Sequence, residues 1–264
     1  MNRMFVVLVL LFAGCASGPP PLPYPAFIAV DELPVAFVAT MPGVRAKQLS
    51  IDPRTQRVSY RLEIPADWKG TTGGSPIHSL EMYVIAGQIN MGEFDLGPGS
   101  YVFLPAGMPG AQLISDSGAI ILAFFDEADS AAVIQTPIIT NSNLIEWQDA
   151  DIGIAMKELR YDPGSGARTW LARITPDAVL GWQRSSQLVE GYLLEGSLTA
   201  SECSGGLPVT GEYSRGGYFN RPPGAVSGGP ETLTTGGAIW YLRVLGENVV
   251  ESVDECPQPE LQES

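Results

Sequence analysis

The heptapeptide EMYVIAG at residues 81–87 returns as EGYLLEG at residues 190–196. A second pair follows in the same order, because GSYVFLPAG at residues 99–107 is matched by GGYFNRPPG at residues 216–224. Each copy combines residues that favour strands with a glycine or proline that ends the strand. A repeat separated by more than 100 residues indicates duplicated domains and excludes a solenoid of short repeats.

Two further anchors extend the alignment of the halves. The dipeptide DP at residues 52–53 recurs at 162–163, and GAI at 118–120 recurs at 237–239. The offset increases between the two repeated motifs, which places an insertion within Ser197–Arg215. Short strands separated by turn signals, without helical periodicity, predict a β sandwich or barrel in each half. We place the domains at residues 31–140 and 141–246.

The composition agrees with a turn-rich β protein and restricts the partners. Among 264 residues there are 30 glycines and 22 prolines, with 45% hydrophobic and only 17% charged residues. The formal net charge is −14, and the sequence has no basic run. Nucleic-acid binding needs clustered lysine and arginine, so we expect no nucleic-acid partner.

The first residues have the layout of a secretion signal. Arg3 supplies a positive start, Met4–Phe12 form a continuous apolar run, and Ala13 and Gly14 are small residues suited to signal peptidase cleavage. The run is too short for a membrane-spanning helix, which needs about 20 apolar residues. We therefore predict a signal peptide over residues 1–14.

The end of this segment, LFAGC at residues 11–15, resembles the lipobox of bacterial lipoproteins. The resemblance implies that Cys15 carries lipid and anchors the protein to a membrane of the cell envelope. Ala16 stands where an aspartate would mark inner-membrane retention, which favours an outer-membrane anchor facing the periplasm. Residues 15–30 are rich in proline and would form an extended tether. The alternative is an ordinary signal peptide with a cysteine at this place by chance.

The cysteine count fits an exported protein. There are three cysteines, and if Cys15 is lipidated then Cys203 and Cys256 remain as a pair. An oxidising compartment favours a disulfide between them over two free thiols. Such a bond would tie a loop of the second domain to the acidic C-terminal tail, residues 247–264.

The repeated motifs resemble those of the cupin superfamily, and specifically a bicupin. The strand ending in glycine and the proline-containing turn after it are both present twice, and the second copy is similar to ChrR-type cupins. The resemblance covers roughly residues 45–245 and implies an all-β chain with two tandem jelly-roll barrels. In the family, histidines and a glutamate of these motifs hold a divalent metal such as Fe, Mn, Ni or Zn.

The metal-binding positions do not carry over to this chain. The family glutamate falls on Leu80 in the first half and on Val189 in the second. The family histidines fall on or near six residues without an imidazole: Gly74, Pro76, Gly110, Gln183, Ser185 and Ser227. We therefore predict no metal cofactor at the family positions.

The remaining candidates for a metal site are His78, the only histidine of the chain, and Glu81. Glu81 and Glu190 each lie one residue after the family position, and neighbouring residues of a strand point to opposite faces. Both glutamates should then face away from the barrel interior and be exposed or paired with arginine. His78 and Glu81 are three apart, which again separates their faces. A metal site at His78 and Glu81 is the alternative to a metal-free protein.

These expectations favour a non-catalytic module that binds a small organic ligand or an envelope protein partner. Trp182, Tyr192 and Trp240 in the second half could line a pocket for such a ligand. The competing hypothesis is a degenerate cupin enzyme, dioxygenase-like or isomerase-like, that uses an atypical site near His78 and Glu81. The sequence alone leaves open which ligand, process or oligomeric state applies.

Overall fold

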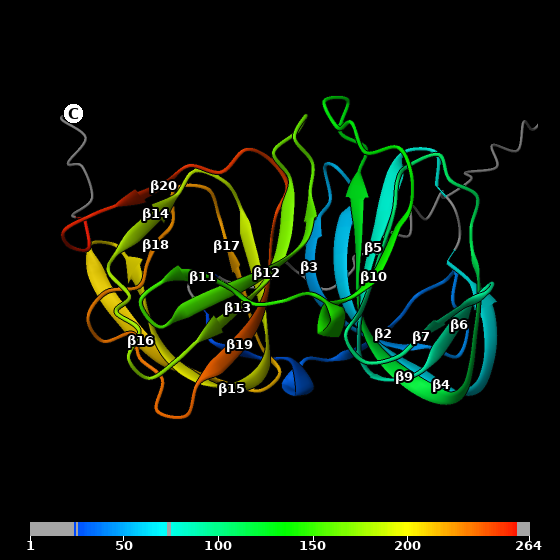
Figure 1. The fold of residues 1–264 in the computed structure, drawn as a ribbon, viewed down its shortest axis with the longest axis horizontal. Helices are drawn as coiled ribbons and strands as arrows, with labels where there is room; N and C mark the ends of the chain where they lie inside the picture. The colour runs from blue at the N-terminus through cyan, green and yellow to red at the C-terminus, as the bar shows by residue number, and fades with distance from the viewer. Residues whose placement is uncertain (1–23, 25, 73–74, 258–264) are drawn as a thin grey trace, which may run out of the picture.

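The computed structural model describes Tyr24 and residues 26–72 and 75–257. The chain is almost entirely β and forms two curled sheets that lie side by side (Figure 1). Two short 3-10 turns, η1 (Val30–Glu32) and η2 (Ser142–Leu144), accompany the strands. Within the described ranges, we find no helix with the length and apolar character needed to span a membrane.

The N-terminal sheet contains nine antiparallel strands, with the main order β10-β8-β5-β9-β4-β3-β2. Its long central strands pair over almost their whole length, since β4 and β9 keep one register from Val58 to Thr71. The strands are β2 (Val35–Phe37), β3 (Arg45–Asp52), β4 (Arg57–Thr71), β5 (His78–Gly87), β6 (Ile89–Met91), β7 (Phe94–Leu96), β8 (Ser100–Leu104), β9 (Gln112–Glu127) and β10 (Ile138–Asn141).

The C-terminal sheet contains eleven strands, with the main order β11-β12-β13-β19-β15-β18-β14-β20. Strands β16 and β17 pair with β15, and β1 pairs with β17. The strands are β1 (Ile28–Ala29), β11 (Gln148–Asp151), β12 (Ile154–Tyr161), β13 (Arg168–Ile174), β14 (Gln183–Ser185), β15 (Val189–Ser204), β16 (Leu207–Ser214), β17 (Gly217–Arg221), β18 (Val226–Ser227), β19 (Ala238–Val244) and β20 (Val250–Ser252).

The repeated sequence motifs occupy equivalent places in the two sheets. Strand β5 lies between β8 and β9, and β15 pairs in the same way with β17 and β19. The register shifts between Val84 and Ala86 in one sheet and between Leu193 and Glu195 in the other. The duplicated strand ends therefore carry a duplicated β-bulge.

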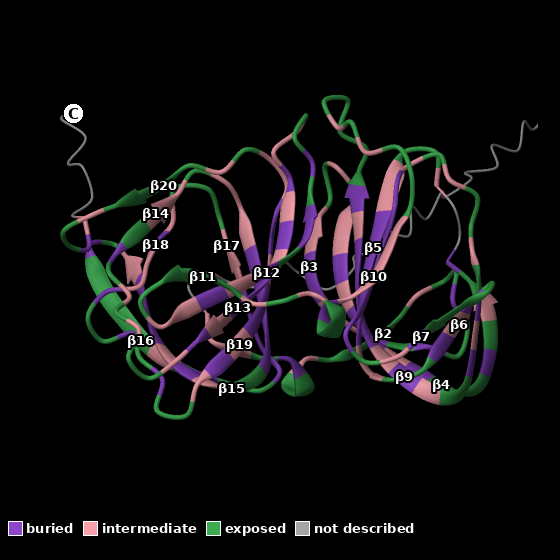
Figure 2. Ribbon diagram, viewed as in Figure 1, coloured by how far each residue is buried: buried purple, intermediate pink, exposed green. Residues whose placement is uncertain are grey.

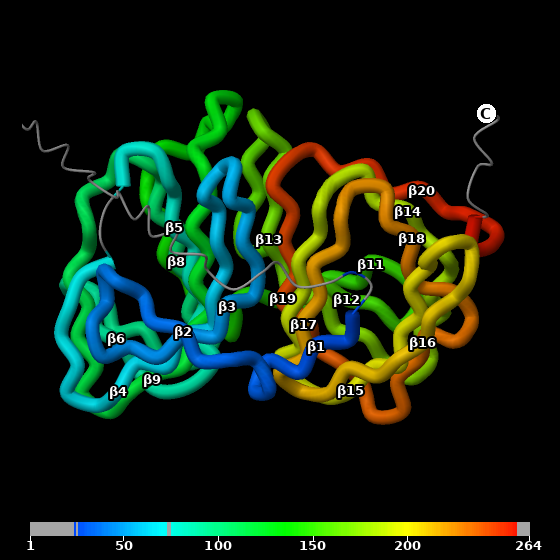
Figure 3. The backbone as a smooth tube through the Cα atoms, turned by 180° about the vertical axis from the view of Figure 1, so that it is seen from behind, coloured from blue at the N-terminus to red at the C-terminus, as the bar shows by residue number. Residues whose placement is uncertain are grey.

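Three segments differ from the expected tether, loop and tail. Strand β1, within residues 15–30, pairs with β17 of the C-terminal sheet, and β2 then joins the N-terminal sheet, so this segment crosses between them (Figure 3). The inserted segment Ser197–Arg215 extends β15 and forms the hairpin with β16 instead of a loop. Strand β20, within residues 247–264, pairs with β14. Backbone pairing explains all three, because each segment satisfies its amide groups in the sheet.

Buried residues occur along the strands of both sheets (Figure 2). They form one large cluster inside each sheet, a third cluster between the sheets, and a small fourth cluster at Trp182, Val226 and Cys256. Alternation along the strands explains this arrangement: Leu80, Met82 and Val84 pack inside the N-terminal sheet, whereas Glu81 and Tyr83 face the other sheet. Strand β5 is therefore covered on both faces, and the polar residues on its second face have to find partners in the other half of the chain.

Candidate functional site

Glu81 on β5 and Glu190 on β15 lie between the two sheets and are 0% and 1% exposed. Leu80 belongs to the interior of the N-terminal sheet, and Val189 packs against the interior cluster of the C-terminal sheet. Strand alternation thus places the glutamates on the face that the sequence predicts. They are paired with arginine and not exposed, because the opposite half of the chain covers that face.

Glu81 is held almost entirely by residues of the C-terminal half. Its Oε1 accepts hydrogen bonds from Thr169 Oγ1 at 2.5 Å and from the Tyr241 hydroxyl at 2.6 Å. Its Oε2 accepts a hydrogen bond from Arg160 Nη2 at 3.3 Å and lies 3.8 Å from Arg243 Nη2. Both oxygens are therefore engaged by donors of the other half.

Glu190 has a related arrangement, with two hydroxyl donors from the N-terminal half and one from its own half. Its Oε1 accepts hydrogen bonds from Ser50 Oγ at 2.8 Å and Ser59 Oγ at 2.7 Å. The Tyr218 hydroxyl donates a third hydrogen bond at 2.6 Å. Ser59 and Thr169 are counterparts in the internal repeat, since they lie seven residues after the two DP dipeptides. Each repeated glutamate therefore bonds to the equivalent hydroxyl position of the other half.

Arg243 on β19 stands at the centre of this group and is 1% exposed. One Nη2 contact reaches Asp126 Oδ2 on β9, and Nη1 lies 3.4 Å from Glu190 Oε2. The guanidinium carbon lies 4.2 Å from the ring centre of Phe124, so the cation also stacks on an aromatic face of the N-terminal half. We call Glu81, Asp126, Arg160, Glu190 and Arg243 the ionic network.

The carboxyl groups of the ionic network differ in their ionisation. Burial would raise the pKa of Glu81, but Arg243 and Arg160 outweigh it and hold that pKa below its ordinary value of 4.5. Burial also opposes ionisation of Glu190, and there Arg243 and Arg57 lower the pKa. Asp126 behaves differently, because burial, Glu190 and Glu81 raise its pKa against the effect of Arg243. Asp126 is thus the carboxyl whose charged form is least favoured.

A cleft of about 630 Å³ opens above the ionic network, between the two halves of the chain. Asp126 and Arg160 are among its lining residues, so the network reaches this cleft. Its lining also includes Arg57 and the apolar groups of Phe103, Pro105, Ile134 and Leu245. A volume of this size is typical of a small-molecule site.

A second hollow, of about 580 Å³, lies beside the edge of the N-terminal sheet. Its lining is mostly apolar and includes Leu104 and Ile139, which pack with the interior cluster of that sheet. Gln112 is the polar side chain among its lining residues. The hollow offers an apolar surface but no histidine or carboxylate for a metal.

His78 and Glu81, the alternative metal pair, are not brought together. The ring nitrogens of His78 lie 3.2 Å from Ser75 Oγ and 3.3 Å from the Thr55 carbonyl oxygen, at the start of β5. Glu81 points into the ionic network, where both of its oxygens have partners. The separation follows from strand alternation, since residues three apart lie on opposite faces.

The donor set does not fit the metal that the family resemblance implies. Leu80 and Val189 place hydrocarbon where the family has a carboxylate. Of the positions expected for histidines, Gly74 lies outside the described residues, and the others hold no imidazole. In the ranges 26–72 and 75–257, no three histidine, cysteine, aspartate or glutamate side chains gather in a way that could hold a metal ion.

Trp182, Tyr192 and Trp240 do not line one pocket, contrary to the expectation from sequence. Trp240 packs inside the C-terminal sheet, Tyr192 belongs to the cluster between the sheets, and Trp182 packs with Val226 and Cys256. Tyr192 precedes Leu193, the residue that pairs with Trp240, so alternation turns Tyr192 to the other face. Their shared position in the second half of the sequence could not reveal that they pack in three different clusters.

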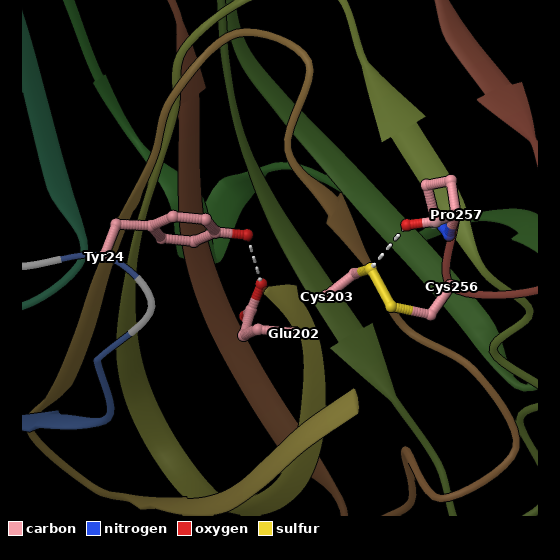
Figure 4. The surroundings of a disulfide bond; sticks show 5 residues. All are labelled: Tyr24, Glu202, Cys203, Cys256 and Pro257. Carbon is pink, nitrogen blue, oxygen red and sulfur yellow. Dashed lines mark hydrogen bonds between the residues drawn. A yellow bond between two sulfur atoms is a disulfide. The ribbon is translucent and has the colours of Figure 1, made fainter. Parts of the chain in front are cut away.

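A disulfide joins Cys203 and Cys256, as the sequence predicts, and closes the C-terminal tail onto β15 (Figure 4). The residue beside it, Glu202, is bound by Arg221 and accepts a hydrogen bond from the Tyr24 hydroxyl at 3.0 Å. The N-terminal and C-terminal segments therefore both attach to this end of β15. The predicted lipidation site, Cys15, lies outside the described residues, as does the predicted signal peptide.

The sequence analysis missed Asp126, Arg160 and Arg243. Arg243 is a charged residue among apolar neighbours in its strand, and such a residue needs a buried partner, so a signal was available for it. Arg160 follows Lys157 and Glu158, and Asp126 precedes another acidic residue, so the sequence pattern does not single them out.

Comparisons with known proteins identify the fold. A family model described as a domain of unknown function (DUF4437) matches residues 38–137. A search of curated proteins finds no match. Among solved structures, a provisionally assigned dioxygenase from Nostoc punctiforme is 23% identical, with a TM-score of 0.68, covering 88% of this chain and 87% of that chain.

Two other solved structures agree with it. The protein YlbA from E. coli, of family DUF861, is 16% identical, with a TM-score of 0.67 and coverage of 83% of this chain and 89% of that chain. A variant of oxalate decarboxylase from Bacillus subtilis is 11% identical, with a TM-score of 0.63 and coverage of 90% and 81%. These similarities, together with the two curled antiparallel sheets, show that the chain has the cupin fold.

Proposed function

We propose that the protein is a metal-independent binding protein of the cell envelope, built as a bicupin whose second half is related to ChrR-type cupins. One observation carries the proposal: hydrocarbon from Leu80 and Val189 stands where the family places its metal-binding carboxylate. A side chain without a donor atom cannot bind Fe, Mn, Ni or Zn at that place. The function then depends on recognition and not on metal chemistry.

The cleft between the two halves is the site proposed for the ligand. It is about 630 Å³ in volume, and it combines charged groups of the ionic network with apolar walls. The ligand is a small organic molecule, and the earlier candidates Trp182, Tyr192 and Trp240 have no part in holding it. The protein is attached to the outer membrane through lipid on Cys15 and faces the periplasm.

Elemental analysis of the purified full-length protein tests the metal-independent function. We expect Fe, Mn, Ni and Zn each well below one equivalent per chain, and no change in metal content for His78→Ala. Stoichiometric metal in the wild type would contradict the proposal. Its loss in His78→Ala would in addition favour the degenerate enzyme, since the structural neighbours include proteins named as a dioxygenase and an oxalate decarboxylase.

Anchoring is tested separately with Cys15→Ser. The wild type should incorporate a labelled fatty acid and sediment with membranes, whereas Cys15→Ser should do neither. An envelope protein partner remains the second candidate for what is bound. Pull-down from membranes at low and high salt would detect it, because salt screens contacts made by an acidic surface.

A further inference from the structure

The cleft between the two sheets, which we call the inter-sheet cleft, contains an arginine without an ion pair to the described residues. Arg57, at the start of β4, lines the cleft, and its buried Nε has no hydrogen-bond partner among the described residues. The guanidiniums of Arg160 and Arg243 are ion-paired with Glu81 and Glu190, whereas Arg57 forms no ion pair within the described part of the chain. Arg57 is therefore the arginine of the cleft lining whose charge is free to meet a ligand, since Arg54 and Arg160 are ion-paired with Asp52 and Glu81.

Arg160 forms the second cationic group at the cleft. Its side chain is 6% exposed, one Nη2 contact reaches Glu81, and its Nε has no hydrogen-bond partner. Arg160 also stacks on Phe103, with 4.2 Å between the guanidinium carbon and the ring centre. The stacking holds the planar cation in place beside an apolar wall, which is the arrangement that suits a carboxylate on a hydrocarbon body.

Three guanidiniums and three carboxyl groups lie at or beneath the cleft. Arg57, Arg160 and Arg243 supply three positive charges, and Glu81 and Glu190 supply two negative charges. The third carboxyl, Asp126, lines the cleft and is ion-paired with Arg243 through Oδ2. A ligand carboxylate at the cleft would therefore compete with Asp126 for the positive charge of the three guanidiniums.

We propose that the inter-sheet cleft binds a small organic monocarboxylate, with its carboxylate against Arg57 and Arg160. Its apolar body lies against Phe103, Pro105 and Leu245. This proposal rests on the proposed function, in which the cleft is a ligand site, and names the ligand class. The ligand then lies between the two curled sheets and not inside either one, so both halves of the chain are needed to form the site.

The rim of the cleft restricts the charge of the ligand. Asp52, Glu127 and Asp129 lie among the lining residues, and the whole chain carries a formal net charge of −14. A second negative charge on the ligand would meet these carboxylates. The cleft should therefore prefer monocarboxylates to dicarboxylates and to inorganic phosphate.

Calorimetric titration of the full-length protein tests this assignment. The probes are acetate, butyrate and benzoate, each compared with its neutral amide, and succinate as a dicarboxylate, all in a buffer without carboxylates. We expect butyrate and benzoate to bind, their amides to bind at least about tenfold more weakly because the charged hydrogen bonds are lost, and succinate to bind more weakly than butyrate.

Two variants and a matched control locate the binding. Arg57→Gln should weaken benzoate binding about tenfold or more, whereas Asp126→Asn, which removes the competing carboxyl, should leave it equal or tighter. Arg184→Gln removes the same charge as Arg57→Gln from a partly exposed side chain outside the cleft, and it should leave the affinity for benzoate unchanged. Arg57 is partly exposed, so its replacement should fold, and circular dichroism checks this.

Three results would overturn the proposal. They are equal binding of the acid and its amide, an Arg57→Gln variant with unchanged affinity, and no binding of any monocarboxylate at millimolar concentration. Equal binding of benzamide would instead point to the apolar hollow beside Leu104 and Ile139. None of these results depends on metal content. The elemental analysis tests the metal-independent function separately.

Discussion

Arg243 contacts three carboxyl groups contributed by both halves of the chain. Its guanidinium meets Asp126, Glu190 and Glu81, and it stacks on Phe124. A buried ion pair contributes little over a well-packed apolar pair, but removing one partner leaves an uncompensated charge. Removing Arg243 should therefore destabilise the protein mainly because it leaves unpaired carboxylates in the interior.

Arg243→Met should lower the free energy of unfolding by about 3–5 kcal/mol, because Glu190 and Asp126 would lose their closest cation. Denaturation in guanidinium chloride, followed by circular dichroism, measures the change. Arg184→Met removes an exposed arginine that lies 4.0 Å from Glu251, and it should cost about 0–1 kcal/mol. Equal effects of the two substitutions would argue against a stabilising role for the ionic network.

At the scale of elements, β15 and β16 hold the two ends of the described chain. The disulfide between Cys203 on β15 and Cys256 closes a segment of 53 residues. On the other side, the ring of Phe27 packs at a tilt against Tyr213 of β16, with ring centres 5.1 Å apart. A β-carbon on Gly211 would come within 2.4 Å of the Phe27 ring, so the glycine is needed for this close approach.

Replacing Cys203 and Cys256 together by serine should lower the free energy of unfolding by about 2–4 kcal/mol, since the unfolded chain regains the freedom of that loop. Denaturation of the oxidised wild type and of the double variant measures the difference. Dithiothreitol should reduce the stability of the wild type by a similar amount and leave the double variant unchanged. A wild type that is insensitive to the reductant would contradict the structural role of the bond.

At the scale of the whole molecule, the ionic network links the stability of the two-sheet assembly to pH. The pKa values of Glu81 and Glu190 lie below 4.5, so their contribution is present above that pH and is lost as pH falls through the folded-state values. Asp126 has the opposite sign, because its pKa is raised above 3.8. Its contribution is present below 3.8 and is lost as pH rises through the folded-state value.

We therefore expect the free energy of unfolding to decrease as pH falls below about 4.5, where Glu81 and Glu190 become protonated in the unfolded chain. In Asp126→Asn, stability relative to the wild type should improve as pH rises from below 3.8. Denaturant titrations of the wild type and of Asp126→Asn at a series of acidic pH values measure how the free energy of unfolding of each depends on pH. A difference between variant and wild type that does not vary with pH would refute the assignment to Asp126.

Prediction from sequence succeeded where it depended on local pattern. Strand alternation correctly turned Leu80 inward and Glu81 away from the interior, and the repeated turns correctly indicated cupin sheets. It was wrong where a contact depended on a distant strand. Trp182, Tyr192 and Trp240 were grouped by their half of the chain, yet they face three different clusters.

The sequence by itself determined the duplicated strands, the face of each repeated residue, and the loss of donor atoms at the family's metal positions. These follow from residue type and from the two-residue period of a strand. Only the tertiary structure decided that Glu81 and Glu190 are buried and share Arg243. The physical reason differs for the two glutamates. Glu190 and Arg243 are cross-strand neighbours on β15 and β19 of one sheet, whereas Glu81 lies on the other sheet, so the packing of the two sheets brings it to Arg243 and buries all three.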